Sequence, residues 1–290
     1  MELWFIYALI STFLAGFITF GFKVAAQYNF DSRLVISFLN LSLGIVSLSV
    51  WLYLGADTAA AELILALGIA SGFGNAFSNI FKVLSLKDID TAIFFPIYKT
   101  LGPIAITFIG ISLFQESFST FEIIGIVTGV VVPLLLIHKN EKDRQGNLWR
   151  GVLFLLFALL FSLIAATVTK AGADSTASLW LFMTAMGFSG AIFALVPFIQ
   201  PKLRQKIRTE KLLNTKTVLL GVALGLIEVV LTYTFILALA GGSLAIVYTI
   251  NSFYILIPIV LSVWFYQEHM NLRKGFAIGL SILAVVFFGL

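Results

Sequence analysis

The chain has 290 residues, of which 60% are hydrophobic and 11% are charged, and its mean hydropathy is +1.06. A soluble domain carries roughly 25% charged residues, so this composition excludes an ordinary water-soluble protein and indicates an integral membrane protein. The net charge of +4 does not indicate nucleic-acid binding, because the basic residues lie mostly between hydrophobic segments rather than in one patch.

Ten hydrophobic segments follow one another along the chain. Each has about 17 to 24 residues, enough for a helix to cross about 30 Å of hydrocarbon. Turn-forming and polar residues separate them. The sequence predicts an all-α integral membrane protein with ten transmembrane helices. The expected ranges are 3–22, 34–54, 63–86, 91–114, 121–137, 150–170, 178–199, 217–239, 243–266 and 273–290.

The start of the chain and the basic residues predict an orientation. Met1-Glu2-Leu3-Trp4 lacks the basic start of a cleavable signal, so we expect the first segment to be retained. Fifteen of the 18 lysines and arginines lie in or beside odd-numbered connections. Cytoplasmic connections are enriched in Lys and Arg, so an even number of spans places both termini on the non-cytoplasmic side of a cell membrane, inner or plasma.

The second half of the chain repeats the first at an offset of about 152 residues. We expect a five-helix repeat at 1–138, a polar linker at 139–149 and a second five-helix repeat at 150–290. Because five is odd, the second copy is inverted in the membrane relative to the first. The matching positions are Gly68, Gly72, Asn75, Gln115, Glu116, Gly125 and Gly129 with Gly221, Gly225, Glu228, Gln267, Glu268, Gly275 and Gly279, the last two with a two-residue slip.

A fourth helix with Pro and Gly, a glutamate at its membrane edge and a Gly-x-x-x-Gly in the fifth helix resemble the EamA branch of the drug/metabolite transporter (DMT) superfamily. The residues are Gly102, Pro103, Glu116, Gly125 and Gly129, then Pro258, Glu268, Gly275 and Gly279. The spacing from Glu268 to Gly275 is shorter than in the first half. The resemblance implies a transporter, with a structural or gating role for both glutamates; its members are associated with amino acids, nucleotides, sugars and cationic drugs. We expect the glycines to be packing sites.

Two ionisable residues lie near the middle of predicted spans, where charge is costly. Glu228 lies within 217–239 and Lys99 within 91–114. Lys99 is a candidate to attract an anionic group of a solute, and Glu228 to bind an ammonium group or a coupling proton. The alternative is a structural Lys–Glu ion pair between helices, and the sequence does not decide between the two.

Further polar residues recur at helical spacing. Asn75, Asn79 and Lys82 are spaced i, i+4 and i+7, which predicts one polar helix face toward a shared cavity; interhelical hydrogen bonds are the alternative. Tyr98, Tyr248, Asn251 and Tyr254 add candidates on the fourth and ninth segments, where the tyrosines could also be interfacial anchors. Lys23 and Lys170 each end the first helix of a half, and we expect both to reach lipid headgroups.

Enzyme activity and metal binding are not expected. Gly187-Phe188-Ser189-Gly190 resembles the Gly-x-Ser-Gly of rhomboid-type serine proteases, but the histidines, His138 and His269, lie at predicted helix ends, so we expect a packing site there. The chain has no cysteine, which excludes disulfides and thiolate metal sites. No phosphate-binding Gly-x-x-x-x-Gly-Lys-Ser/Thr loop occurs, which argues against a primary pump.

These features predict a secondary active transporter that exports or exchanges a small polar metabolite, such as an amino acid or organic anion, by alternating access. Multidrug or lipophilic-cation efflux and a channel-like facilitator are the alternatives. The expected partners are a small-molecule substrate, the lipid bilayer and a candidate coupling proton, with no nucleic acid and no cofactor. The protein is expected to be a monomer or a homodimer.

Overall fold

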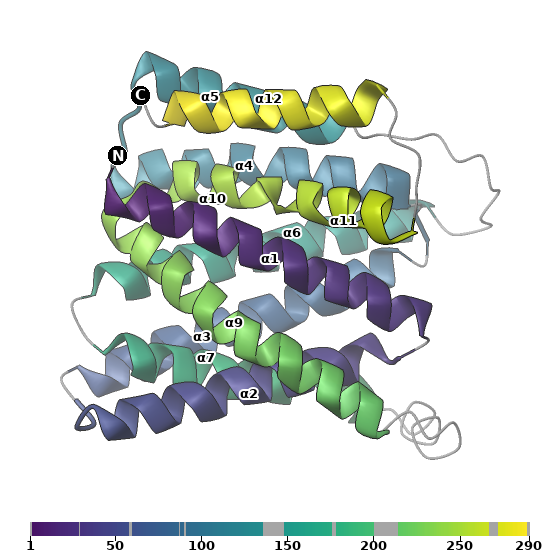
Figure 1. Ribbon diagram of the computed structural model, residues 1–290. Helices are drawn as coiled ribbons and strands as arrows, with labels where there is room; N and C mark the ends of the chain where they lie inside the picture. The colour runs from purple at the N-terminus through teal and green to yellow at the C-terminus, as the bar shows by residue number, and fades with distance from the viewer. Residues whose placement is uncertain are drawn as a thin grey trace.

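A computed structural model describes residues 2–28, 30–57, 60–86, 88–89, 91–135, 148–175, 178–199, 214–266 and 272–288. Every regular element within these ranges is helical. The elements are α1 (Leu3–Gln27), α2 (Ser32–Tyr53), α3 (Ala61–Ser85), α4 (Thr91–Phe114), α5 (Thr120–Leu135), α6 (Leu148–Asp174), α7 (Leu179–Ala194), the 3₁₀ turn η1 (Val196–Ile199), α9 (Thr215–Gly241), α10 (Leu244–Ser252), the 3₁₀ turn η2 (Phe253–Ile255), α11 (Leu256–Tyr266) and α12 (Leu272–Phe288). The helices form one bundle (Figure 1).

Each of the ten predicted segments contains a helix, and the fourth has the bounds that were expected, 91–114. The ninth segment differs, because α10, η2 and α11 divide it. Pro258 explains the division. A proline lacks the backbone N–H that an interior helical position needs, but it is tolerated in the first turn of a helix, where α11 places it.

The protein is a multi-pass membrane protein. Of the described helices, six are long and apolar enough to cross a membrane by length and composition. These six segments are Leu3–Phe22, Arg33–Tyr53, Ala61–Ser85, Ile97–Phe114, Leu148–Asp174 and Thr215–Gly241. Shorter apolar helices accompany them at Thr120–Val132, Leu179–Ala194, Leu244–Pro258 and Gly275–Phe288. Large apolar side chains such as Phe108 and Leu219 are exposed, as expected of a surface that faces lipid.

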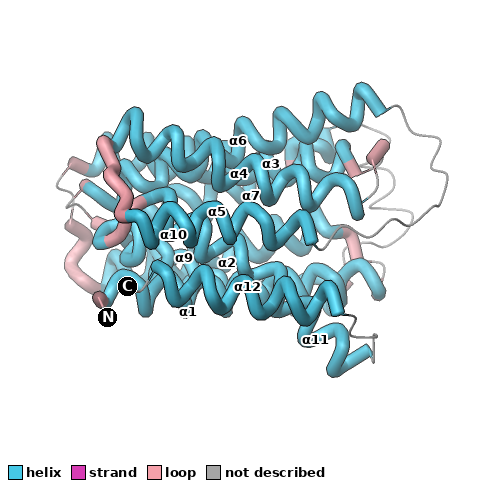
Figure 2. The backbone as a smooth tube through the Cα atoms, turned by 90° about the horizontal axis from the view of Figure 1, so that it is seen from above, coloured by secondary structure: helices cyan, strands magenta, loops and turns pink. Residues whose placement is uncertain are grey.

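Helices from the two halves of the chain pack against each other. The main neighbours are α3 with α6 and α7, α2 with α7 and α9, α1 with α9, and α5 with α12, while α4 contacts α5, α6 and α10. Seen from above, the start of α1 lies near the end of α12, at the side where both termini lie (Figure 2). The start of α1 and the end of α12 are therefore at the same end of the bundle (Figures 1 and 2).

Some of the glycines that were expected to pack helices do so. A Cβ atom at Gly68 would lie 2.6 Å from the carbonyl oxygen of Phe182, and one at Gly225 would lie 2.7 Å from that of Leu39. Gly125 packs against the ring of Phe288, and Gly129 against Thr249. Gly275 and Gly279 differ: they are exposed, and no atom of the described chain lies within 4 Å of a Cβ added to either.

Candidate functional site

A cavity of about 220 Å³ lies where helices of both halves meet. It brings together eight of the nine residues expected to bind substrate or a coupling ion. These are Asn75 and Lys82 on α3, Tyr98 and Lys99 on α4, Glu228 on α9, Tyr248 and Asn251 on α10, and Tyr254 in η2. Of the polar face predicted on the third helix, Asn75 and Lys82 thus line one shared cavity.

Both cavity lysines lie against aromatic rings. The Lys99 Nζ atom is 3.9 Å from the centroid of the Tyr254 ring, and the Lys82 Nζ atom is 4.8 Å from that of Tyr98. The electron-rich ring faces attract the ammonium groups without neutralising them. The Tyr98 hydroxyl lies 3.3 Å from the hydroxyl of Ser78. These contacts hold two cations at the α3 and α4 side of the cavity.

The carboxylate of Glu228 lies on α9 and accepts a hydrogen bond from the Thr232 hydroxyl at 3.3 Å. Among the ion pairs of the described residues, none joins Glu228 to Lys82 or Lys99 within 4.0 Å. The structural Lys–Glu pair considered from the sequence is therefore not formed in this conformation. The carboxylate and the two ammonium groups instead line the same cavity separately.

Asn79 is the predicted candidate that does not line this cavity. It lines a second cavity of about 350 Å³ with residues of α2, α3, α7 and η1, among them Arg33 and Phe77. Each residue turns an α-helix by about 100°, so Asn79, four residues after Asn75, points about 40° away from it around the helix. The Lys82 Nζ atom donates a hydrogen bond to the side-chain oxygen of Asn79 at 3.3 Å, which connects Asn79 to a residue of the central cavity.

Sequence reasoning missed the hydroxyl groups that α6 places in the cavity. Ser162 and Thr169 both line it. The Ser162 hydroxyl lies 3.5 Å from that of Tyr248, and the Thr169 hydroxyl lies 2.8 Å from that of Ser71. Their spacing of seven residues, two helical turns, was the signal available in the sequence.

Glu116 contacts backbone in the other half of the chain. Gln115 has a left-handed conformation (φ 54°), and the N–H of Glu116 donates to the carbonyl of Gly110 at 3.0 Å, which closes the end of α4. The Glu116 carboxylate accepts hydrogen bonds from the backbone N–H groups of Leu244 and, at 3.3 Å, Ala245. Its repeat partner Glu268 lies outside the described residues.

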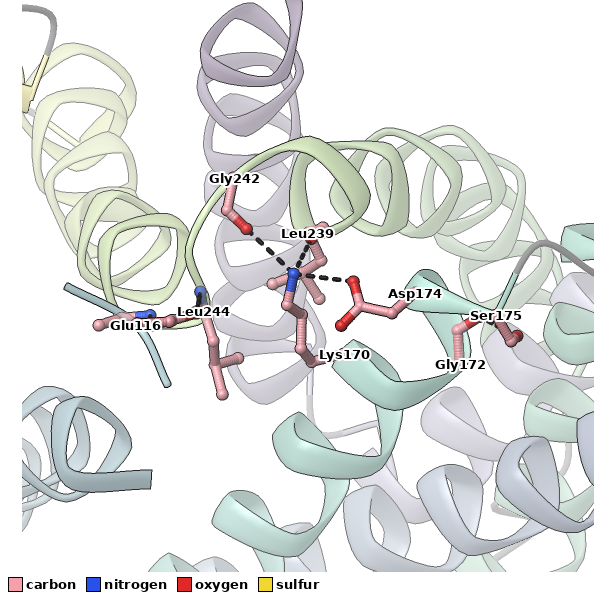
Figure 3. A network of polar contacts seen from close by, with 9 residues as sticks. Glu116, Lys170, Gly172, Asp174, Ser175, Leu239, Gly242 and Leu244 are labelled. Atoms are coloured by element: carbon pink, nitrogen blue, oxygen red, sulfur yellow. Dashed lines mark hydrogen bonds and ion pairs between the residues drawn. The ribbon is translucent and has the colours of Figure 1, made fainter. Parts of the chain in front are cut away.

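The expectation that Lys170 reaches lipid headgroups was wrong. Its exposed fraction is 8%, and its Nζ atom donates to the carbonyl oxygens of Leu239 at 2.6 Å and Gly242 at 3.2 Å (Figure 3). The Nζ atom is also 2.8 Å from the carboxylate of Asp174. Three partners satisfy the three donors of the ammonium group, so it stays inside the protein. The side chain of Lys23 is outside the described part of the chain.

Ser189 is a packing residue in this structure. Its side chain is 6% exposed, and its hydroxyl donates to the carbonyl of Ala185 at 2.7 Å. Gly72 of α3 packs directly against it. The hydroxyl is thus occupied within its own helix at a close contact between α3 and α7, while His138 and His269 lie outside the described residues.

Comparisons with known proteins identify transporter families. Residues 149–290 match the EamA-like transporter family, and residues 36–128 match the Small Multidrug Resistance protein family. Neither family is a family of enzymes. No curated protein matches the sequence.

Among solved structures, one protein crystal structure superposes with a TM-score of 0.75. Its sequence is 15% identical, and the alignment covers 97% of this chain and 96% of that one, so the likeness shows a shared fold. A structure of the sodium-calcium exchanger NCX_Mj is 13% identical over 99% of this chain and 97% of its own. Its TM-score of 0.20 carries no argument about this chain.

Proposed function

This chain belongs to the EamA-type transporters of the DMT superfamily, and from that premise we propose that it is a secondary active transporter of a small zwitterionic or anionic metabolite. The cavity at the meeting of the two halves is the proposed binding site. Solute binds there and is exposed to each side of a cell membrane in turn.

The separation of charge around the cavity carries this proposal. Lys82 on α3, Lys99 on α4 and Glu228 on α9 all line the cavity, and among the described contacts no ion pair joins the carboxylate to either lysine. A solute carboxylate fits the lysines, and an ammonium group or a coupling proton fits Glu228. Hydrogen bonds between ionised groups are about twice as strong as neutral ones, so such a solute gains most from this arrangement.

The size of the cavity favours a metabolite over a drug. Sites for drug-sized ligands have volumes of about 300–1,000 Å³. The central cavity, at about 220 Å³, is below that range. Efflux of a lipophilic cation is the second candidate, because residues 36–128 match the Small Multidrug Resistance protein family and tyrosine rings line the cavity. The two cavity lysines oppose it, since they repel a cation.

The contacts between helices support two inverted five-helix repeats. The proposed repeat pairs α1 with α6, α2 with α7, α3 with α9, α4 with α10 and α5 with α12. If each helix is replaced by its repeat partner, a contact in one half should correspond to a contact in the other. The contact of α1 with α9 corresponds in this way to that of α6 with α3, and the contact of α2 with α9 corresponds to that of α7 with α3. We take residues 1–138 and 150–290 as the repeats, ten spans in all, which move against each other around the cavity.

Direction, coupling and orientation are parts of the same proposal. We propose export or exchange, with Glu228 as the site of a coupling proton and both termini on the non-cytoplasmic side. The basic residues of the odd-numbered connections support this orientation.

Counterflow in proteoliposomes tests the proposed site. Proteoliposomes that contain wild type, Glu228→Gln or Lys99→Met are loaded with a pooled, labelled mixture of amino acids and organic acids. We expect saturable exchange in wild type and a 10- to 100-fold loss in each variant, because a hydrogen bond to a charged group contributes about 1.5–3 kcal/mol. Glu122→Gln is the matched control, since the Glu122 carboxylate accepts from the backbone of Ser119 at the start of α5 and does not line the cavity.

Equal exchange by wild type and both variants would show that the site is assigned to the wrong residues. If wild type moves a cationic dye but exchanges no amino acid or organic acid, the substrate is a lipophilic cation and not the proposed metabolite.

A further inference from the structure

Side chains from three parts of the chain contact the connection between α9 and α10, taken here with the helix ends beside it as residues 239–245. Lys170 of α6 donates to the carbonyl oxygens of Leu239 and Gly242, and Glu116 accepts from the N–H groups of Leu244 and Ala245. The ring of Trp4, at the start of α1, packs against Gly242. Figure 3 shows Lys170 and Glu116 approaching this connection from different sides.

The signs of the two charges match the helix ends that they contact. Carbonyl groups at the carboxyl end of a helix are left unpaired and carry partial negative charge, and N–H groups at the amino end carry partial positive charge. Lys170 binds the end of α9, and Glu116 binds the start of α10. The connection is therefore held by two opposite charges that bind backbone groups.

The connection joins two helices that line the cavity. Glu228 lies on α9 before it, and Tyr248 and Asn251 lie on α10 after it. Ala166, one helical turn before Lys170 on α6, lines the cavity as well. In Figure 1 the connection lies at the end of the bundle where α1 begins.

Lys170 keeps an ion-pair partner if the connection moves away. Asp174 lies on the same helix as Lys170, so their ion pair survives the loss of both carbonyl contacts. Asp174 is also 41% exposed, which lets water reach the pair. Release therefore does not leave an unpaired buried ammonium group, the outcome that makes breaking most buried ion pairs costly. Lys170 can alternate between two bonding arrangements.

We propose that Lys170 and Glu116 form a latch that holds residues 239–245 and keeps the cavity closed toward the end of the bundle where α1 begins. This proposal rests on the proposed alternating access. In it, Lys170 and Glu116 are positioning residues that keep one side of the cavity closed. Its release moves the start of α10 away from α6 and opens the cavity at that end.

Labelling of an introduced cysteine tests the latch without knowledge of the solute. The chain contains no cysteine, so Ala166→Cys supplies a single thiol in the cavity wall. A charged, membrane-impermeant thiol reagent is added to intact cells and to inverted membrane vesicles. A tag on the amino terminus identifies the side on which α1 begins.

We expect slow labelling from that side when the latch is intact. Lys170→Met should raise the labelling rate from that side at least fivefold and lower it from the opposite side, and Lys170→Arg, which keeps charge and donors, should restore much of the wild-type pattern. Glu116→Gln should act in the same direction, because it removes the charge on the other arm. Glu122→Gln, the matched carboxylate outside the connection, should leave both rates unchanged.

Labelling rates that stay at wild-type values in folded Lys170→Met and Glu116→Gln proteins overturn the latch. If Lys170→Met does not fold, Glu116→Gln alone decides the result. The latch and the proposed function can fail separately. If the latch variants change the labelling rates but wild type exchanges no amino acid or organic acid, the latch is supported and the proposed substrate class is wrong. If wild type exchanges a metabolite but the latch variants label at wild-type rates, the proposed function is supported and the latch is wrong.

Discussion

Each charged group of the central cavity has a neutral partner beside it. Lys99 lies over the ring of Tyr254, Lys82 donates to Asn79, and Glu228 accepts from Thr232. Burying a charge without any partner is costly, and pairing it with an opposite charge would neutralise it. Neutral partners reduce the cost of burial and leave the charge available to a solute.

Asp31 provides a test of electrostatics outside the membrane-spanning segments. Its carboxylate accepts from the backbone N–H of Arg33 at 2.9 Å at the start of α2 and forms a 2.8 Å ion pair with the Arg33 side chain. Burial acts to raise the pKa of Asp31, but the hydrogen bonds and charge of Arg33 outweigh burial and hold the pKa below its ordinary value. The contribution to stability is therefore complete at neutral pH and is lost as the pH falls through this lowered pKa.

We expect Asp31→Ala to reduce the free energy of unfolding by about 1 kcal/mol at pH 7, since it removes the cap of α2. The deficit relative to wild type should shrink below about pH 4, where the wild-type carboxyl also loses its charge. Thermal unfolding in detergent at pH 7 and pH 3 measures this. Asp31→Asn keeps a capping oxygen and should lie between the two proteins, and a deficit that is the same at both pH values would contradict the expectation.

Sequence reasoning located charges within hydrophobic segments but not their partners. Lys99 and Glu228 stood out because ionisable residues are rare in hydrophobic segments. The burial of Lys170 could not be predicted, because the carbonyl groups that it binds are 69 and 72 residues away in the chain. Asn79 and Asn75 share a helical face in the sequence, yet a 40° difference in direction places them in different cavities.

At the scale of single elements, glycines decide how closely two helices approach. We expect Gly68→Ala to destabilise the protein by about 1–3 kcal/mol, because the added Cβ would lie 2.7 Å from that of Ala185 and force α3 and α7 apart. Thermal unfolding measures the change. Gly279→Ala is the matched control in α12, where no described atom lies within 4 Å, and it should be neutral or stabilising by up to about 1 kcal/mol.

A Gly68→Ala protein that is as stable as wild type would show that α3 and α7 are not in close contact. A loss of stability in Gly279→Ala would instead show that α12 packs against atoms outside the described residues.

Helix positions were predictable because hydrophobic length and polar breaks determine them. The fourth segment, 91–114, needed no correction, while 243–266 needed one because Pro258 interrupts it. Hydrophobic length does not show where a long apolar segment changes from one helix to another. The roles expected for Gly275 and Gly279 rested on a spacing that also occurs at exposed positions.

At the scale of the whole molecule, the start of α1 and the end of α12 lie at one end of the bundle, so we propose that both chain ends face one side of the membrane. We expect tags at the amino and carboxyl termini to be cleaved by protease from the same side, and that side to be non-cytoplasmic. Asn140→Cys, in the basic fifth connection, should react with an impermeant reagent only from the opposite side. Asp57→Cys, in the second connection, should react from the side of the termini; if tags at the two ends are cleaved from different sides, the proposed arrangement of spans is wrong.

The break at η2 makes the two halves unequal at the level of the cavity. In the first half α4 runs unbroken from Thr91 to Phe114, whereas its counterpart in the proposed repeat changes to 3₁₀ winding at Phe253–Ile255, close to Asn251. A 3₁₀ helix has 3.0 residues per turn rather than 3.6, so α11 is rotated relative to the continuation of a straight helix. In a carrier of the proposed kind, the two resting orientations then differ in free energy. This difference sets the side on which the empty carrier waits, while the gradients of the solute and of the proposed coupling proton set the direction of net flux.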